Sequence, residues 1–212
     1  MFGPNTANSL KWWYTFLIRS LSLSALVRTS FKSRSKMILY FVRHGQTDFN
    51  KEHRLQGIQF DEPLNADGVS DMQKLVKTLP TDFEVIYASA LERVMASAEI
   101  ISKKTGKPII TDSDITEKSV GTLAGKTWEE IPNGHELHEK DGLVEYDYRP
   151  YGGESVEDVE KRFRKFIKEV RKANKNALIV TSIGIIRIAY KLLLARKGKI
   201  EVKNASVHRF EI

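Results

Sequence analysis

Short apolar runs alternate along this chain with longer stretches that carry an amphipathic helical pattern. Met37–Val42, Phe83–Tyr87 and Ala177–Thr181 are largely continuous runs of this kind, rich in β-branched and aromatic residues. Strands with this composition are typically buried on both faces, as in sheets that are covered by helices on both sides. The alternation therefore predicts a mostly parallel sheet joined by helical crossovers.

Four amphipathic stretches predict the helices, because each repeats apolar residues at intervals of three and four. Asn65 is a candidate N-cap, Gly106 a helix stop, and Ser155 with Asp158 a capping box. The expected helices are Asp67–Leu79, Ser89–Lys104, Ser155–Ala173 and Gly184–Ala195. The predicted fold class is α/β, a three-layer α/β/α sandwich with a mostly parallel central sheet.

The segment Thr127–Gly152 interrupts this alternation. It is polar and contains Pro132, Gly134, Gly142 and Pro150, which are residues that favour turns and loops. Loops are also where binding residues concentrate. We expect an irregular insertion with some helix, placed near the functional site as a lid.

The positive charge of the chain is concentrated before the first predicted strand. The formal net charge is +7, from 34 Lys and Arg residues against 27 Asp and Glu residues. Residues 1–36 contain six of the basic residues and none of the acidic ones, which leaves 28 against 27, or +1, for residues 37–212. A nearly neutral body lacks the charge excess of a nucleic-acid-binding domain, so we expect no nucleic-acid partner. We divide the chain into a basic leader, residues 1–36, and one domain, residues 37–212.

Three interpretations of the leader stay open. It is no part of the fold, with translation starting at Met37, or it is an Arg- and Ser-rich transit peptide, or its aromatic residues place a helix on a membrane surface. Arg19 interrupts the apolar run well short of the roughly 18 residues that a membrane span requires, so we expect no transmembrane segment. We expect a cytoplasmic protein, or an organellar one if the leader is a transit peptide.

Several site classes are excluded by what the sequence lacks. The chain has no cysteine, which rules out disulfides, a CxxC redox pair and a thiolate zinc site. His135-Glu136-Leu137-His138 does not match HExxH, because the second histidine would have to stand at Glu139. Neither GxGxxG nor GxxxxGK[ST] occurs. We expect no metal and no cofactor.

The residues directly after the first predicted strand carry the strongest chemical signal. The segment Arg43-His44-Gly45-Gln46-Thr47-Asp48-Phe49-Asn50 follows Met37–Val42, and ligands of parallel sheets bind beyond the carboxyl ends of the strands. A guanidinium beside an imidazole, followed by a glycine that permits close backbone approach, suits an anionic phosphoryl group attacked by a nitrogen nucleophile.

This segment and four later ones resemble, in order, the histidine phosphatase superfamily, whose fold is shared with cofactor-dependent phosphoglycerate mutases. The RHG hallmark is Arg43-His44-Gly45, within an RHGQTxxN sequence that ends at Asn50. The resemblance implies a phosphoglycerate mutase-like form of the predicted sandwich. The other matches are Leu55–Gly68 for QG…D.PL…G, Ser89–Ala98 with Arg93 for SPLxRxxxTA, Glu117 with Gly121 and Gly125 for E…G…G, and Gly152–Ser155 with Arg162 and Phe163 for GES…R.

The resemblance implies a two-step phosphoryl transfer without a metal. His44 attacks phosphorus to form a phosphohistidine, which water then hydrolyses, while Arg43 and Arg93 offset the developing charge. Glu117 protonates the leaving oxygen, for which it has to carry a proton when the substrate binds. Taken alone, Arg93 would be a solvated charge on a helix face and Glu117 a loop carboxylate paired with Lys118. The residues implied in substrate binding are Gly45, Gln46, Asn50, Gln56, Gly57 and Ser182.

The chain departs from the family pattern at a second histidine. Val180-Thr181-Ser182-Ile183-Gly184 matches V-[ST]-H-G-G, so Ser182 stands at the histidine position and Ile183 at the first glycine. The family histidine would donate a charge-assisted bond to the phosphoryl group, whereas serine is shorter and neutral. Loss of one such preorganised donor costs about 10²–10³ in rate.

The sequence thus predicts a metal-independent phosphomonoester hydrolase that acts on a small phosphorylated metabolite, such as a sugar phosphate, and that is slowed by Ser182. The alternative is a pseudophosphatase that binds phosphorylated ligands without turnover. A phosphoglycerate mutase-type phosphotransferase is less favoured, because such mutases resemble RHGES and carry longer insertions. The oligomeric state stays open, a homo-oligomer included.

Overall fold

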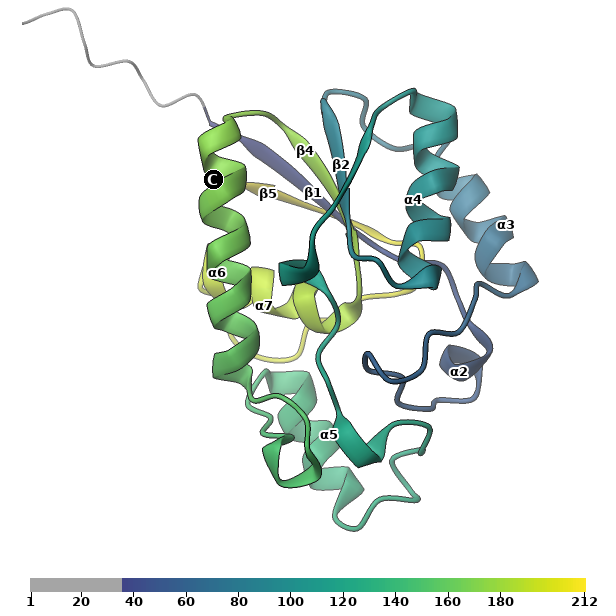
Figure 1. The fold of residues 1–212 in the computed structure, drawn as a ribbon, viewed down its shortest axis with the longest axis vertical. Helices are drawn as coiled ribbons and strands as arrows, with labels where there is room; N and C mark the ends of the chain where they lie inside the picture. Colours follow the sequence, from purple (N-terminus) through teal and green to yellow (C-terminus); the bar gives the residue numbers. More distant parts are fainter. Residues whose placement is uncertain (1–35) are drawn as a thin grey trace, which may run out of the picture. The chain divides into compact units, whose positions relative to one another are not determined.

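The computed structural model describes residues 36–212, so the interpretations of the leader lie outside the described residues. Its centre is a five-stranded sheet with the strand order β3-β2-β4-β1-β5 (Figure 1). The pairs β1–β4, β4–β2 and β2–β3 are parallel, and β5 is antiparallel to β1. The mostly parallel sheet is confirmed. The strands are β1 (Ile38–Arg43), β2 (Val85–Ala88), β3 (Ile109–Thr111), β4 (Ala177–Thr181) and β5 (Val207–Glu211).

Helices cover both faces of the sheet (Figure 1). Among residues 36–212, no helix combines the length and hydropathy that a membrane crossing needs. The α-helices are α2 (Asp48–Lys51), α3 (Ala66–Leu75), α4 (Glu92–Thr105), α5 (Gly134–Leu143), α6 (Val156–Ala173) and α7 (Ile183–Leu194). Three short 3₁₀ helices are η1 (Ser113–Ile115), η2 (Gly121–Leu123) and η3 (Arg149–Tyr151).

Strand β1 shows why the molecule has three layers. Successive side chains of a strand point to opposite faces, and here both faces are apolar. Leu39 and Phe41 pack in the core formed with α6 and α7, whereas Tyr40 and Val42 pack in a second core formed with α3 and α4. The predicted α/β/α sandwich is confirmed.

The local signals for helix ends are confirmed. The Asn65 side chain accepts a hydrogen bond from the Gly68 backbone N–H at 2.8 Å, and Gly106 ends α4 with a left-handed φ of 69°. Ser155 and Asp158 form the predicted capping box of α6. Helix α4 begins at Glu92 rather than Ser89, because the Asp61 carboxylate accepts the Glu92 backbone N–H.

Two edge strands, β3 and β5, are not predicted from the sequence. Strand β3 has only three residues, and β5 carries polar side chains with only Phe210 buried. Both are held by pairing with a neighbouring strand, so their own sequence gives a weak signal.

Candidate active site

A cavity of about 390 Å³ lies at the carboxyl ends of β1 and β4. Parallel sheets bind ligands at this edge, and Figure 1 shows α2 and α5 at this end of the sheet. The structure brings seven of the predicted site residues into the cavity wall, whereas the other three, Gly45, Gln46 and Ser182, are not part of it. The seven are Arg43, His44, Asn50, Gln56, Gly57, Arg93 and Glu117.

His44 is buried and held in one tautomer. Its Nδ1 lies 2.7 Å from the Gly45 carbonyl oxygen, and because a carbonyl only accepts, Nδ1 carries the hydrogen and Nε2 keeps its lone pair. Burial, followed by the charges of Arg43 and Arg93, lowers the pKa of His44 well below its usual 6.5. The unliganded site therefore presents a neutral imidazole with a free nucleophilic nitrogen.

Arg43, which is half-buried, and Arg93, which is buried, bring two guanidinium groups to the same cavity. Arg43 Nη1 donates to the Val202 carbonyl at 2.6 Å, and Arg93 Nη2 donates to the Gly57 carbonyl at 2.8 Å. The Nε atoms of both arginines are buried without a hydrogen-bond partner in the described part of the chain. Two guanidinium groups at one cavity suit an oxyanion.

The electrostatics of these arginines are dominated by burial. Burial, with a smaller contribution from Arg187 and Arg93, lowers the pKa of Arg43 to about 10 in spite of the opposing effect of Glu117. Arg43 remains a cation at neutral pH. Arg93 is only 1% exposed, so its interpretation as a solvated charge on a helix face is wrong.

Gly45 and Gln46 support the loop that carries His44. A Cβ on Gly45 would lie 2.6 Å from the Gly68 carbonyl oxygen, so only glycine allows the loop to approach the start of α3 this closely. The Gly45 N–H donates to Ser97 Oγ at 3.1 Å, and Gln46 Oε1 accepts from Asn65 at 3.1 Å. These interactions orient both residues toward α3 and α4 rather than toward the cavity.

Asn50 is fixed by a residue that sequence reasoning missed. The Asn204 side-chain amide donates to Asn50 Oδ1 at 2.9 Å and to the His44 carbonyl at 3.1 Å. Asn50 Oδ1 also accepts the Thr47 backbone N–H, which leaves its amide nitrogen as the donor for a ligand. Asn204 lies 154 residues further along the chain, and no local motif marks it.

Glu117 sits among hydrogen-bond donors. Its Oε1 accepts the Lys118 backbone N–H at 2.8 Å, and its Oε2 accepts the Gly184 N–H at the start of α7 at 3.2 Å. Burial alone would raise the pKa of Glu117, but the Lys118 charge and these hydrogen bonds outweigh burial and lower it to about 2. Glu117 is therefore ionised in the unliganded site, and its expected protonation when the substrate binds stays a prediction.

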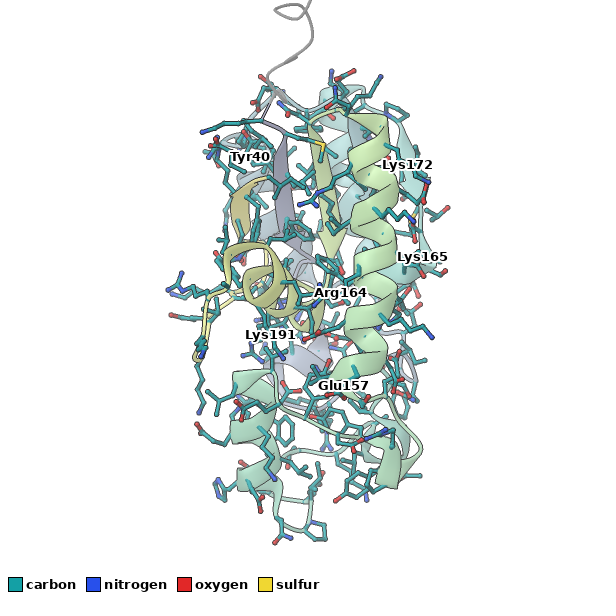
Figure 2. The ribbon with its side chains drawn as sticks, turned by 90° about the vertical axis from the view of Figure 1, so that its left-hand side faces the viewer. Tyr40, Glu157, Arg164, Lys165, Lys172 and Lys191 are labelled. Atoms are coloured by element: carbon teal, nitrogen blue, oxygen red, sulfur yellow. The ribbon has the colours of Figure 1, made fainter. Side chains whose placement is uncertain are left out.

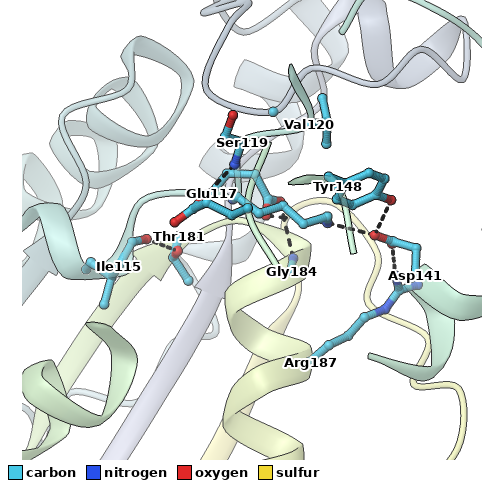
Figure 3. Close-up of polar contacts among 12 residues, drawn as sticks. Ile115, Glu117, Ser119, Val120, Asp141, Tyr148, Thr181, Gly184 and Arg187 are labelled. Carbon is cyan, nitrogen blue, oxygen red and sulfur yellow. Dashed lines mark hydrogen bonds and ion pairs between the residues drawn. The ribbon is translucent and has the colours of Figure 1, made fainter. Parts of the chain in front are cut away.

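Lys118 and Asp141 extend this site into a buried ion network (Figure 3). Lys118 Nζ lies 3.6 Å from Glu117 Oε1 and 3.0 Å from Asp141 Oδ1. Asp141 also accepts from Arg187 Nη1 at 3.0 Å and from the Tyr148 hydroxyl at 2.9 Å. The pairing of Glu117 with Lys118 was one interpretation of the sequence. The contribution of Asp141, from the irregular insertion, had no sequence signal.

Ser182 differs from its expected place in the site. It is 1% exposed, and its hydroxyl has no hydrogen-bond partner within residues 36–212. It occupies the N-cap position of α7 without making a side-chain cap, and the next residue, Ile183, lines the cavity. A short side chain at this position does not reach the cavity wall.

The insertion forms one side of the cavity, in agreement with its expected position near the site. Trp128, Glu129, His135, His138 and Asp141 all line it, and Trp128 stacks on His138 with ring centroids 4.8 Å apart. The part of the chain that the structure describes contains no group of three or more His, Cys, Asp or Glu side chains arranged to hold a metal ion.

Comparison with known proteins places this geometry in a family. The model of the histidine phosphatase superfamily (branch 1) matches residues 39–212. Phosphoglycerate mutase-like protein 4 of Arabidopsis thaliana is 29% identical over 181 residues, covering 81% of this chain and 77% of that protein. The metal-independent phosphoserine phosphatase of the same plant is 28% identical, covering 80% and 74%. The solved structure of a mycobacterial glucosyl-3-phosphoglycerate phosphatase with VO3 superimposes with a TM-score of 0.73 at 26% identity, covering 82% of this chain and 90% of that one.

The close approach of α7 to Glu117 yields a first prediction. A Cβ on Gly184 would overlap Glu117 Oε1 and lie 3.1 Å from Lys118 Nζ, whereas alanine is favourable in a helix. We expect Gly184→Ala to displace the carboxylate and to lower kcat for phosphomonoester hydrolysis about 10²-fold, since proton transfer contributes about that much, with little loss of thermal stability. The control is the same substitution in a Glu117→Ala background. Equal losses in both backgrounds would show that Gly184 acts on something other than Glu117.

Proposed function

The chain belongs to the histidine phosphatase superfamily, and we propose that it is a phosphomonoester hydrolase that acts on a small phosphorylated metabolite through a phosphohistidine intermediate. The observation that carries this proposal is the neutral His44 beside two arginines, with all three side chains lining one cavity. The hydrogen bond from Nδ1 to the Gly45 carbonyl leaves the Nε2 lone pair of His44 free. The arginine charges attract a phosphoryl group, and the His44 nitrogen is placed to attack its phosphorus.

In the proposed reaction, each side chain has a defined role. His44 Nε2 attacks phosphorus while Nδ1–H stays bonded to the Gly45 carbonyl, which stabilises the positive charge that the ring acquires. Arg43 and Arg93 bind the phosphoryl oxygens as charge builds on them. Glu117 transfers a proton to the leaving oxygen and then takes one from the water that hydrolyses the phosphohistidine.

The relatives support a small phosphorylated substrate and a reaction without a metal. Their names include a metal-independent phosphoserine phosphatase and a glucosyl-3-phosphoglycerate phosphatase. In the proposed mechanism the guanidinium groups of Arg43 and Arg93 supply the positive field that a metal supplies in other phosphoryl-transfer enzymes. The cavity of about 390 Å³ is within the size range of small-molecule sites.

The essential prediction concerns His44. We expect His44→Ala to lower kcat for hydrolysis of p-nitrophenyl phosphate at least 10³-fold, because the substitution removes the nucleophile. His208→Gln is the matched control, since His208 lies on β5 and bonds to Tyr190 and Ser206, and it should leave kcat within a few fold of the original. A wild-type rate no higher than that of His44→Ala would contradict the proposal and favour a pseudophosphatase that binds phosphorylated ligands without turnover.

A third prediction concerns the family histidine that this chain lacks. We expect the double variant Ser182→His with Ile183→Gly to raise kcat by up to about 10²-fold, because it adds one preorganised donor and removes the side chain that lines the wall there. Ser182→His alone should give a smaller gain. Steady-state kinetics and a thermal unfolding midpoint within a few degrees of wild type provide the readout. A stable double variant with unchanged kcat would show that the missing donor does not limit the reaction.

A further inference from the structure

Within residues 36–212, every polar group that holds the Glu117 carboxylate is a hydrogen-bond donor or a cation. Oε1 accepts a backbone N–H and faces the Lys118 ammonium, and Oε2 accepts the N–H of Gly184 (Figure 3). A carboxylic acid has to donate its own hydrogen to an acceptor or leave it unpaired. A protonated Glu117 in the unliganded site would lose one of these interactions and turn a hydrogen toward a donor.

Lys118 is locked in place as the cation of this arrangement. It is 4% exposed and lies between the Glu117 and Asp141 carboxylates, with the Tyr146 ring centroid 5.1 Å from its Nζ. Burial by itself would lower the pKa of Lys118, but the two carboxylates raise it above its usual 10.5. Asp141 is in turn held by Arg187 and Tyr148, so the ammonium keeps its charge and its position.

The other charged and titratable groups around Glu117 come from every element that surrounds it. Arg43 and His44 approach from the end of β1, and Arg93 approaches from α4. The Glu117 charge acts to raise the pKa of all three residues. Tyr146 and Tyr148 approach from the insertion. With His44 neutral, the cations outnumber the carboxylates, and the surroundings favour an ionised Glu117.

We propose that this site takes its substrate as the phosphomonoester monoanion, and that Lys118 enforces the choice by holding Glu117 ionised. The proposal rests on the proposed function. Because Glu117 has no proton to give in the empty site, the proton for the leaving oxygen arrives on the substrate. Lys118 is a positioning residue in this scheme, since it acts through Glu117, and Asp141 is its buried counterion.

The proton and charge balance of the step is complete with the monoanion. The phosphate O–H of the bound monoanion passes its proton to Glu117, and Glu117 passes it to the ester oxygen as the phosphorus–oxygen bond breaks and the bond to His44 Nε2 forms. The alcohol leaves neutral. Water then attacks phosphorus, Glu117 takes one of its protons and returns it to the phosphate, which departs as a monoanion with His44 neutral again.

The first test uses the full chain and two alkyl phosphomonoesters with different second pKa values, glycerol 2-phosphate and trifluoroethyl phosphate. The second ionisation of a phosphomonoester lies near pH 6, and electron withdrawal lowers it. We expect kcat/KM to fall as the pH rises above the second pKa of each ester. The midpoints of the two alkaline limbs should therefore differ by as much as the second pKa values of the two esters. An alkaline limb at the same pH for both esters would overturn the proposal.

The second test follows the acidic limb. Lys118 is the largest of the influences that lower the pKa of Glu117, so Lys118→Gln raises that pKa, and a protonated Glu117 cannot accept the proton of the monoanion. We expect the acidic limb of kcat/KM, which falls by up to tenfold per pH unit, to begin at a higher pH in Lys118→Gln than in wild type. Asp141→Asn leaves the Lys118 charge facing Glu117, so the acidic limb should stay at the wild-type pH. Lys118→Arg keeps a cation at this position and should return the limb to the wild-type pH.

Lys165→Gln is the matched control for the loss of a lysine. The Lys165 side chain lies on the outer face of α6 (Figure 2), is 71% exposed and pairs with Asp114 at 2.8 Å. The pH profile of Lys165→Gln should therefore equal that of wild type. An acidic limb in Lys118→Gln at the wild-type pH would overturn the proposal, as would equal limbs in Lys118→Gln and Asp141→Asn. If wild type hydrolyses neither ester faster than His44→Ala, the proposed function itself fails. The ester comparison needs no variant, so it holds even if Lys118→Gln does not fold.

Discussion

Two guanidinium groups at the carboxyl edge of the sheet determine the rest of the site. Arg93 is buried and Arg43 is half-buried, and a cation removed from water is stable only with partners that compensate for lost hydration. Backbone carbonyls of Val202, Gly57 and Phe60 satisfy part of this requirement. The field of the two arginines lowers the pKa of His44 and contributes to the ionisation of Glu117.

The fold holds these charges in place through close backbone approaches. The glycine of the RHG segment lets the His44 loop touch the start of α3, and Gly184 lets the first turn of α7 meet Glu117. Parallel β1 and β4 end at the same edge, so the loop after one strand and the helix after the other converge there. The insertion completes the site, because Asp141 on α5 balances Lys118 and Arg187.

Sequence reasoning succeeded where the signal was local. The apolar runs, the Asn65 and Ser155 caps and the RHG segment each depend on a few neighbouring residues, and each lies where it was expected. It failed where partners are distant: Asn204 and Asp141 carry no motif, and β5 is defined by its pairing with β1. The ionised state of Glu117 in the unliganded site was not visible in the sequence, because Lys118 and the Gly184 N–H act together only in the folded chain.

In the proposed reaction, His44 becomes covalently phosphorylated during turnover. The most direct measurement is rapid mixing of the full chain with a ³²P-labelled phosphomonoester, an alkaline quench, and identification of the labelled residue by peptide mapping and NMR. Because Nδ1–H is bonded to the Gly45 carbonyl, the account predicts label on Nε2 of His44, with formation and decay as fast as turnover. Release of labelled phosphate with no label on His44, or label on another residue, would contradict it.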